Sequence, residues 1–198
     1  MSPERDAELE ERLVERQVLP GGTYLTFVRD TVVTHDDKHH SRDVVIHPGA
    51  VAMVGLLADR RVLLVRQYRH PTGEILMEIP AGTLDMMDDG SVEEPLPAAK
   101  RELWEETGYR AGSWRLLSAF WTAPGFASEL MHLYLATDLE KDPDYDGPEE
   151  DERLRVVEMD FDEALAQAAD GTLRDAKSLI GLFMTDRLAK AGEVPELS

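Results

Sequence analysis

An unbroken apolar run at residues 51–58 is the feature that most restricts how this chain can fold. The run is too short to cross a bilayer, which takes roughly 18–20 apolar residues, so it indicates a buried strand. A turn at Asp59-Arg60 and a second strand pattern at residues 61–68 follow directly. Together the two segments predict a β-hairpin in the interior.

Strand and helix patterns alternate around this hairpin. Further strands are expected at residues 23–34, 44–46, 75–79, 116–120, 130–136 and 154–158, and helices at 96–107, 160–170 and about 175–191. Residues 7–17 have helix-like spacing but few apolar side chains, and we interpret them as a surface segment. The pattern predicts an α/β fold, a mixed sheet with helices on it, and a boundary at Pro48-Gly49.

The sequence is strongly acidic, with a formal net charge of −19 over 198 residues. Such a surface repels nucleic acid, and no basic cluster offers a groove for it, so we expect no nucleic-acid partner. The acids either form a solvated surface or include a group that binds divalent cations. The chain has no cysteine, and its first residues lack the apolar part of a secretory signal. We therefore expect a cytoplasmic protein without a membrane segment.

Three glutamates share one stripe of the predicted helix at residues 96–107. Glu102 and Glu106 are one turn apart, and Glu105 lies beside Glu102. Like charges at this spacing destabilise a helix by roughly 0.2–0.5 kcal/mol per pair, whereas a divalent cation would reverse the sign of the interaction. From spacing alone, a solvated acidic face explains the pattern equally well.

The order of residues in this helix resembles a known signature. Residues 101–109, RELWEETGY, are similar to the second half of the Nudix box, G-x5-E-x7-R-E-U-x-E-E-x-G-U, in which U is bulky and apolar. Glu93 stands at the required seven-residue spacing before Arg101. The departure is at Gly82: ten residues separate it from Glu93 instead of five, so the loop between them carries a five-residue insertion.

The flanking residues resemble one subgroup, the ADP-ribose and nucleoside-diphosphate-sugar pyrophosphatases. The similar segments are residues 65–69 (VRQYR), 76–82 (LMEIPAG) and 171–177 (GTLRDAK), together with Pro124, 16 positions after Gly108. The resemblance implies an α/β/α sandwich with a mixed sheet. It also implies that residues 1–48 form an N-terminal β segment exchanged across a homodimer, and that residues 49–198 form the hydrolase domain.

The resemblance implies a metal centre for Mg²⁺ or Mn²⁺. Glu102 and Glu106 would be ligands, Glu105 would assist, and the backbone carbonyl of Ala81 would be a further ligand. Arg101 would hold a glutamate through a bidentate pair, which is a structural role.

The resemblance also implies a general base from a loop beyond the central strands, which here is the acidic loop at residues 147–152. We favour Glu150, with Glu152 second as base or metal ligand, to take the proton of the attacking water. A solvated loop charge is the alternative explanation for either residue.

The remaining candidates would bind the substrate. Arg66 and Arg69 suit phosphate, against the alternative of surface or dimer salt bridges. Glu78 would bind the ribose or base, or is an ordinary charge at a strand end. Glu129 would line the ribose pocket, or is a solvated charge. Pro124 lies where the subgroup carries a proline.

Three functions fit this reading. The first is hydrolysis of ADP-ribose to AMP and ribose 5-phosphate. The second keeps the chemistry but takes another nucleoside diphosphate sugar, such as GDP-mannose. The third is a catalytically silent Nudix domain that senses a nucleotide, against which the intact glutamate set argues.

Overall fold

The computed structural model describes residues 9–22, 25–147 and 153–197. The chain divides into two compact units. The smaller unit comprises Met1–Pro48 and Trp121–Leu130, and the larger comprises Gly49–Phe120 and Met131–Ser198. Residues 121–130 thus group with the N-terminal segment. The expected division into 1–48 and 49–198 placed them in the second part. The expected assignment of roles to the two parts stays a prediction.

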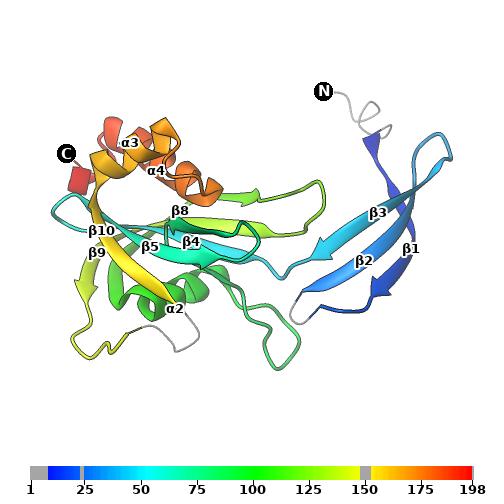
Figure 1. Ribbon diagram of the computed structural model, residues 1–198, viewed down its shortest axis with the longest axis horizontal. Helices are drawn as coiled ribbons and strands as arrows, with labels where there is room; N and C mark the ends of the chain where they lie inside the picture. Colours follow the sequence, from blue (N-terminus) through cyan, green and yellow to red (C-terminus); the bar gives the residue numbers. More distant parts are fainter. Residues whose placement is uncertain (1–8, 23–24, 148–152, 198) are drawn as a thin grey trace. The chain divides into compact units, whose positions relative to one another are not determined.

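The smaller unit contains a three-stranded antiparallel sheet in the order β1-β2-β3 (Figure 1). Its strands are β1 (Arg12–Leu19), β2 (Thr26–Val33) and β3 (His39–Ile46). Strand β1 forms although the spacing of its residues is helix-like. Pairing with β2 satisfies the backbone hydrogen bonds of β1 whatever the period of its side chains. Cross-strand ion pairs reinforce the register. Arg16 donates two hydrogen bonds, of 2.8 and 2.6 Å, to the buried carboxylate of Asp30, and Arg29 donates to Asp43 of β3 at 2.7 Å.

The larger unit is built on a mixed sheet. Its strands are β4 (Ala50–Leu56), β5 (Arg61–Arg69), β6 (Glu74–Glu78), β7 (Ala81–Thr83), β8 (Tyr109–Trp121), β9 (Leu130–Lys141) and β10 (Leu154–Asp160). Their order is β10-β5-β4-β9-β8, with β6 paired to β5 and β7 paired to β4. Strand β4 runs parallel to β9 and antiparallel to β5, so the predicted hairpin forms at the centre of the sheet.

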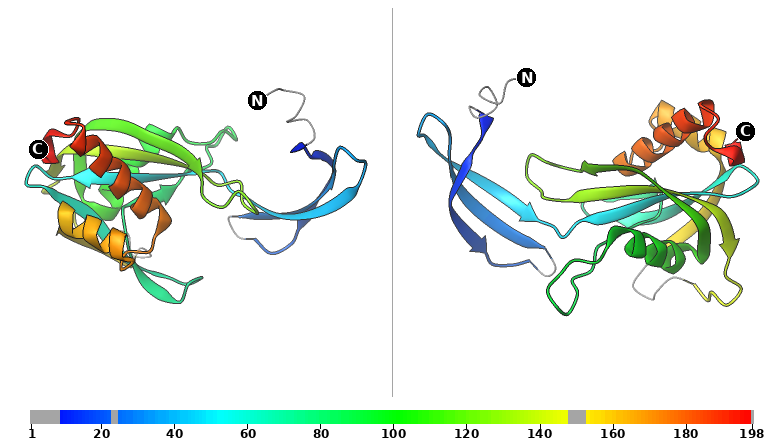
Figure 2. Two further views of the ribbon diagram at one scale, coloured as in Figure 1. Left: turned by 90° about the horizontal axis from the view of Figure 1, so that it is seen from above. Right: turned by 180° about the vertical axis from the view of Figure 1, so that it is seen from behind.

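Strand β4 explains why helices cover both faces of this sheet. All seven of its residues are buried, and successive side chains point to opposite faces. Ala52 and Val54 join a core cluster with helices α3 (Phe161–Asp170) and α4 (Ala176–Lys190). Val51 and Met53 join a second cluster with helix α2 (Pro95–Thr107). Figures 1 and 2 show α2 on one face and α3 with α4 on the other, which confirms the α/β/α sandwich.

The helix ends follow the local sequence. The side chain of Asp160 accepts hydrogen bonds from the backbone N–H groups of Asp162 and Glu163, which caps α3 as expected. The side chain of Asp175 caps α4 in the same way, at the backbone N–H of Ser178. Helix α2 ends at Gly108, whose φ of 72° suits glycine. In the described part of the chain, no helix is long and apolar enough to cross a membrane.

The loop that follows β9 is attached to the end of α2. Asp142 accepts a 3.0 Å hydrogen bond from the indole of Trp104, and its backbone N–H donates to the carbonyl of Gly108 at 2.8 Å. The hydroxyl of Tyr145 donates to the carbonyl of Glu105 at 2.7 Å. The backbone N–H of Asp144 and the guanidinium of Arg110 hold the pKa of Asp142 below its ordinary value. The acidic loop therefore begins at a fixed place beside α2.

We expect Gly108→Ala to destabilise the larger unit more than Gly171→Ala. Both glycines end helices with positive φ, of 72° and 83°, and an alanine there costs about 1–2 kcal/mol in backbone strain. A Cβ at Gly108 would also come within 2.3 Å of the Tyr145 ring, whereas a Cβ at Gly171 meets nothing within 4 Å. Urea unfolding measures both free energies. Equal losses for the two variants would contradict the close packing of Tyr145 on Gly108.

Candidate metal and active site

Two buried glutamates of α2 lie against the backbone of β7. Glu102 is 7% exposed and Glu106 is 3% exposed. The backbone N–H of Ala81 donates a 3.0 Å hydrogen bond to Oε2 of Glu106. A Cβ built on Gly82 would come within 1.9 Å of the Glu102 carboxyl carbon, so only glycine leaves room for that carboxylate. The helical i and i+4 spacing thus brings both carboxylates to one short strand.

Arg101 holds the surrounding carboxylates. It donates two hydrogen bonds to Glu93, of 3.3 and 2.8 Å, and Nη1 donates to Glu102 at 2.9 Å and to Glu105 at 2.8 Å. The hydrogen bonds from Arg101 hold the pKa of Glu93 below its ordinary value, and the same partners raise the pKa of Arg101. One guanidinium therefore orients three glutamates, and it cannot neutralise all of them together with Glu106.

This donor set fits a hard divalent cation in its chemistry. Carboxylate and backbone carbonyl oxygens are the ligands that Mg²⁺ prefers, and the surplus negative charge would favour it. Within the described residues, however, no group of three or more histidine, aspartate or glutamate side chains stands together as a metal site. Arg101 separates Glu102 from Glu105 by bonding to both. The assignment of Glu102, Glu105, Glu106 and Ala81 to a metal therefore stays a prediction.

The insertion between Gly82 and Glu93 closes on itself. The backbone N–H of Glu93 donates to the carbonyl of Asp85 at 2.9 Å, and Met86 and Val92 form an isolated antiparallel bridge. The turn between them is tightened by a 2.8 Å bond from the Met87 N–H to the Ser91 carbonyl. The additional residues leave and rejoin the chain at neighbouring points, so Glu93 still reaches Arg101.

Two of the expected substrate-binding residues belong to a buried charge cluster. Glu78 is 1% exposed, and its two oxygens accept 2.8 Å hydrogen bonds from Arg69. Lys177 of α4, which the sequence analysis did not single out, also donates to Glu78. Burial raises the pKa of Glu78, but the Arg69 hydrogen bonds and the Lys177 charge outweigh it, and the net pKa lies below the ordinary value. A substrate role for Glu78 or Arg69 stays a prediction.

The other candidates lie elsewhere. Arg66 is exposed on β5, directly opposite Arg155 of β10. Pro124 and Glu129 belong to the smaller unit, where Glu129 accepts a hydrogen bond from Thr122 and lies 3.6 Å from His47 Nε2. Glu150 and Glu152, the candidate bases, fall outside the described residues.

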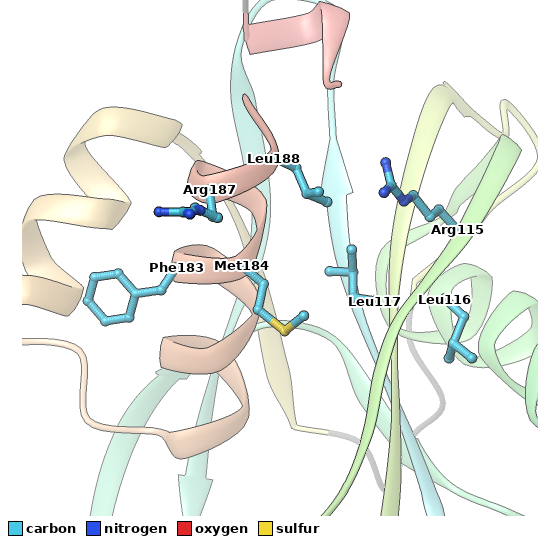
Figure 3. Close-up of a pocket in the computed structure, with 7 residues that line it drawn as sticks. All are labelled: Arg115, Leu116, Leu117, Phe183, Met184, Arg187 and Leu188. Carbon is cyan, nitrogen blue, oxygen red and sulfur yellow. The ribbon is translucent and has the colours of Figure 1, made fainter. Parts of the chain in front are cut away.

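A separate pocket lies between α4 and β8 (Figure 3). Its lining residues are Arg115, Leu116, Leu117, Phe183, Met184, Arg187 and Leu188. Leu117, Met184 and Leu188 face the space between the helix and the strand. None of these lining residues is acidic, so the pocket is no site for a hard cation. It is distinct from the glutamates of α2.

We expect Gly82→Ala to weaken Mn²⁺ binding by about 10-fold or more, since groups that orient metal ligands contribute about that much. The new methyl group would displace the Glu102 carboxylate while the strand keeps an ordinary backbone conformation. Gly125→Ala is the control, because a Cβ there meets nothing within 4 Å. Titration of Mn²⁺ followed by electron paramagnetic resonance measures both. Unchanged affinity in Gly82→Ala would separate Glu102 from metal binding.

Comparison with known proteins places this site in a family. Residues 46–180 match the NUDIX domain. The chain is 35% identical over 173 residues to the methanol dehydrogenase activator of Bacillus methanolicus, covering 87% of the chain and 91% of the relative. It is 35% identical over 170 residues to the ADP-ribose pyrophosphatase of Bacillus subtilis, covering 86% and 89%. It is 34% identical over 164 residues to the GDP-mannose pyrophosphatase of Cronobacter sakazakii, covering 75% and 82%.

A solved structure shows the same fold. The crystal structure of an ADP compounds hydrolase superposes with a TM-score of 0.76 at 21% identity, and the match covers 93% of this chain and 97% of the other. The family match includes both the box residues from Glu93 to Tyr109 and the sheet that supports them. The chain therefore belongs to the NUDIX domain family.

Proposed function

We propose that this protein hydrolyses the pyrophosphate of ADP-ribose to AMP and ribose 5-phosphate, with a divalent metal ion as cofactor. The observation that carries the proposal is the pair of buried carboxylates, Glu102 and Glu106, set against β7 within a NUDIX domain. Relatives from Bacillus subtilis and Mycobacterium tuberculosis that are named ADP-ribose pyrophosphatases support this substrate.

Mg²⁺ or Mn²⁺ is the proposed ion. Glu102 and Glu106, assisted by Glu105 and the carbonyl of Ala81, would hold it. When bound, such an ion neutralises pyrophosphate charge and lowers the pKa of water. Their position supports this role, because both buried carboxylates lie against the same three-residue strand, where one ion would contact them together.

The protein's own groups would orient the reaction. Arg101 keeps Glu102 and Glu105 at fixed positions through its 2.9 and 2.8 Å hydrogen bonds, and it reaches Glu93 with its other edge. Glu150, with Glu152 second, remains our proposal for the base that takes a proton from water. Arg66, Arg69, Glu78, Glu129 and Pro124 remain proposals for contacts with the substrate, and of the two arginines Arg66 is exposed on β5.

We also propose that the protein is a homodimer joined through its N-terminal sheet. Four large apolar side chains are exposed on strands β1 and β2: Leu13, Val14, Val18 and Phe27. Exposed apolar groups gathered on one small sheet are typical of an interface.

A charge on this sheet should separate the subunits. We expect Val18→Glu to reduce the mass of the particle from twice 22.2 kDa toward 22.2 kDa, because burying an unpaired carboxylate opposes association. Ile75→Glu, at an exposed apolar residue of the larger unit, is the matched control and should leave the mass unchanged. Light scattering after size exclusion measures both. A wild-type protein of 22.2 kDa would refute the dimer.

The proposed activity is tested with a panel of substrates in Mg²⁺ or Mn²⁺. The panel contains ADP-ribose, GDP-mannose, UDP-glucose, NADH and diadenosine polyphosphates, and chromatography identifies the products. We expect AMP and ribose 5-phosphate from ADP-ribose, faster than any other turnover and abolished by EDTA. Preference for GDP-mannose, the substrate named for several relatives, would keep the chemistry and change the substrate. No turnover of any compound would favour the nucleotide-sensing alternative.

Glu106→Gln should retain the fold and lose turnover. The amide keeps the size of the side chain but removes the charge, so we expect kcat to fall at least about 100-fold, since even outer partners of metal ligands contribute about 10–100-fold. Glu140→Gln, an exposed residue of β9, is the control and should retain full activity. Circular dichroism checks folding. Full activity of Glu106→Gln would exclude this residue from the metal site.

A further inference from the structure

The beginning of helix α4 is bonded to the strand that precedes the carboxylate site. Lys177 is almost buried, and its ammonium group bonds to Glu78 at the end of β6 and to Asp175 at 3.0 Å. Asp175 in turn caps the helix through the backbone N–H of Ser178 at 3.0 Å. Glu78 is paired as well with Arg69. The cluster therefore ties one helix end to one strand end through alternating charges.

Ser178 makes a second and neutral connection. Its side chain is fully buried, and its hydroxyl oxygen accepts a 2.7 Å hydrogen bond from the backbone N–H of Ile79. The same hydroxyl donates to Asp175. The backbone of Ile79 thus depends on a side chain almost one hundred positions away in the sequence.

The segment between these contacts and α2 is short and held at each residue. Glu78 and Ile79 bond to α4, the carbonyl of Pro80 accepts a 2.9 Å hydrogen bond from Met53 N–H, and the N–H of Ala81 donates to Glu106. Proline fixes the backbone φ in the middle of the segment. A displacement at α4 would therefore be transmitted to Ala81 and to the Glu106 carboxylate.

Arg69 extends the same coupling. Its pKa is raised chiefly by its hydrogen bonds to Glu78, and the charges of Glu106 and Asp175 add to the effect. The cation thus stands within the electrostatic influence of both the α4 cluster and the carboxylate site.

We propose that Lys177 and Ser178 are positioning residues for the metal site, which hold the segment from Glu78 to Ala81 so that Ala81 and Glu106 keep their spacing. This inference rests on the proposed function, since it assumes that these groups bind a divalent ion. Neither side chain needs to touch the ion or the substrate. A buried ion pair adds little net stability, but it selects one geometry where several are possible.

Mn²⁺ binding by the isolated protein tests this role without reference to turnover. The variants are Lys177→Met, which leaves Glu78 paired with Arg69, and Ser178→Ala, which removes the acceptor for Ile79 N–H. Lys190→Met is the matched control, because Lys190 lies on the same helix, is 71% exposed and pairs with Asp186. Electron paramagnetic resonance titration gives the Mn²⁺ dissociation constants, and urea unfolding gives stability.

We expect both variants to weaken Mn²⁺ binding by about 10-fold while the control stays within twofold of the wild type. If the wild type is active, the Mn²⁺ concentration needed for half-maximal rate should rise more than the KM for ADP-ribose. Should one variant fail to fold, the other decides. Mn²⁺ affinity equal to that of the wild type in a folded variant would overturn the proposal and leave a purely structural role.

The same titration separates this inference from the proposed function. A wild type that binds Mn²⁺ but cleaves no compound of the panel refutes the hydrolase, whereas the comparison of variants still decides the positioning role. A wild type that binds no Mn²⁺ refutes the metal assignment and overturns this inference with it.

Discussion

The contact between Ala81 and Glu106 is the interaction on which the arrangement of the larger unit depends. It joins the short strand β7, which belongs to the sheet through β4, to the carboxylate stripe of α2. Beside it, Gly82 leaves room for Glu102 against the same backbone. Because backbone hydrogen bonds hold one helical turn rigid, fixing Glu106 also fixes Glu102. The site is therefore defined by a helix face and three residues of strand.

The crowded negative charge around α2 is tolerated because the carboxylates accept hydrogen bonds from the protein. Arg101 binds three glutamates at distances between 2.8 and 3.3 Å, and the backbone N–H of Ala81 binds a fourth. At the end of β6 the charges alternate, with Glu78 between Arg69 and Lys177. In a protein with net charge −19, Arg69, Arg101 and Lys177 thus lie beside buried carboxylates.

The sequence predicted the elements whose pattern is local. The apolar run at residues 51–58 matches β4, and the spacing of Glu102, Leu103 and Glu106 matches the two faces of α2. The surface interpretation of residues 7–17 holds for the described residues 9–17, which are exposed. The sequence did not predict that residues from Arg12 onward form β1, because that strand depends on pairing with β2. Strand β8 is 13 residues long where five were expected. Its first half mixes the packed side chains of Tyr109 and Trp114 with Arg110, Gly112 and Ser113, so it carries no clear strand pattern.

The contacts that organise the candidate site were harder to predict. Strand β7 has only three residues and no pattern of its own, so only its partner β4 reveals it. Lys177 and Ser178 meet Glu78 and Ile79 across 99 positions of sequence, and no periodicity encodes such a pairing. Asp175 did carry a signal, as an aspartate at the start of an expected helix. That signal located the helix and not its partner.

The insertion that departs from the family spacing has a consequence for how this chain can vary. Its ends meet at the hydrogen bond between Asp85 and Glu93, and its turn points Met86 and Met87 to solvent. The length of the loop is thus uncoupled from the distance between β7 and α2. Residues gained or lost there during evolution would change the surface near the candidate site without moving Glu102 or Glu106. A lineage can therefore alter what approaches the site while inheriting the site intact.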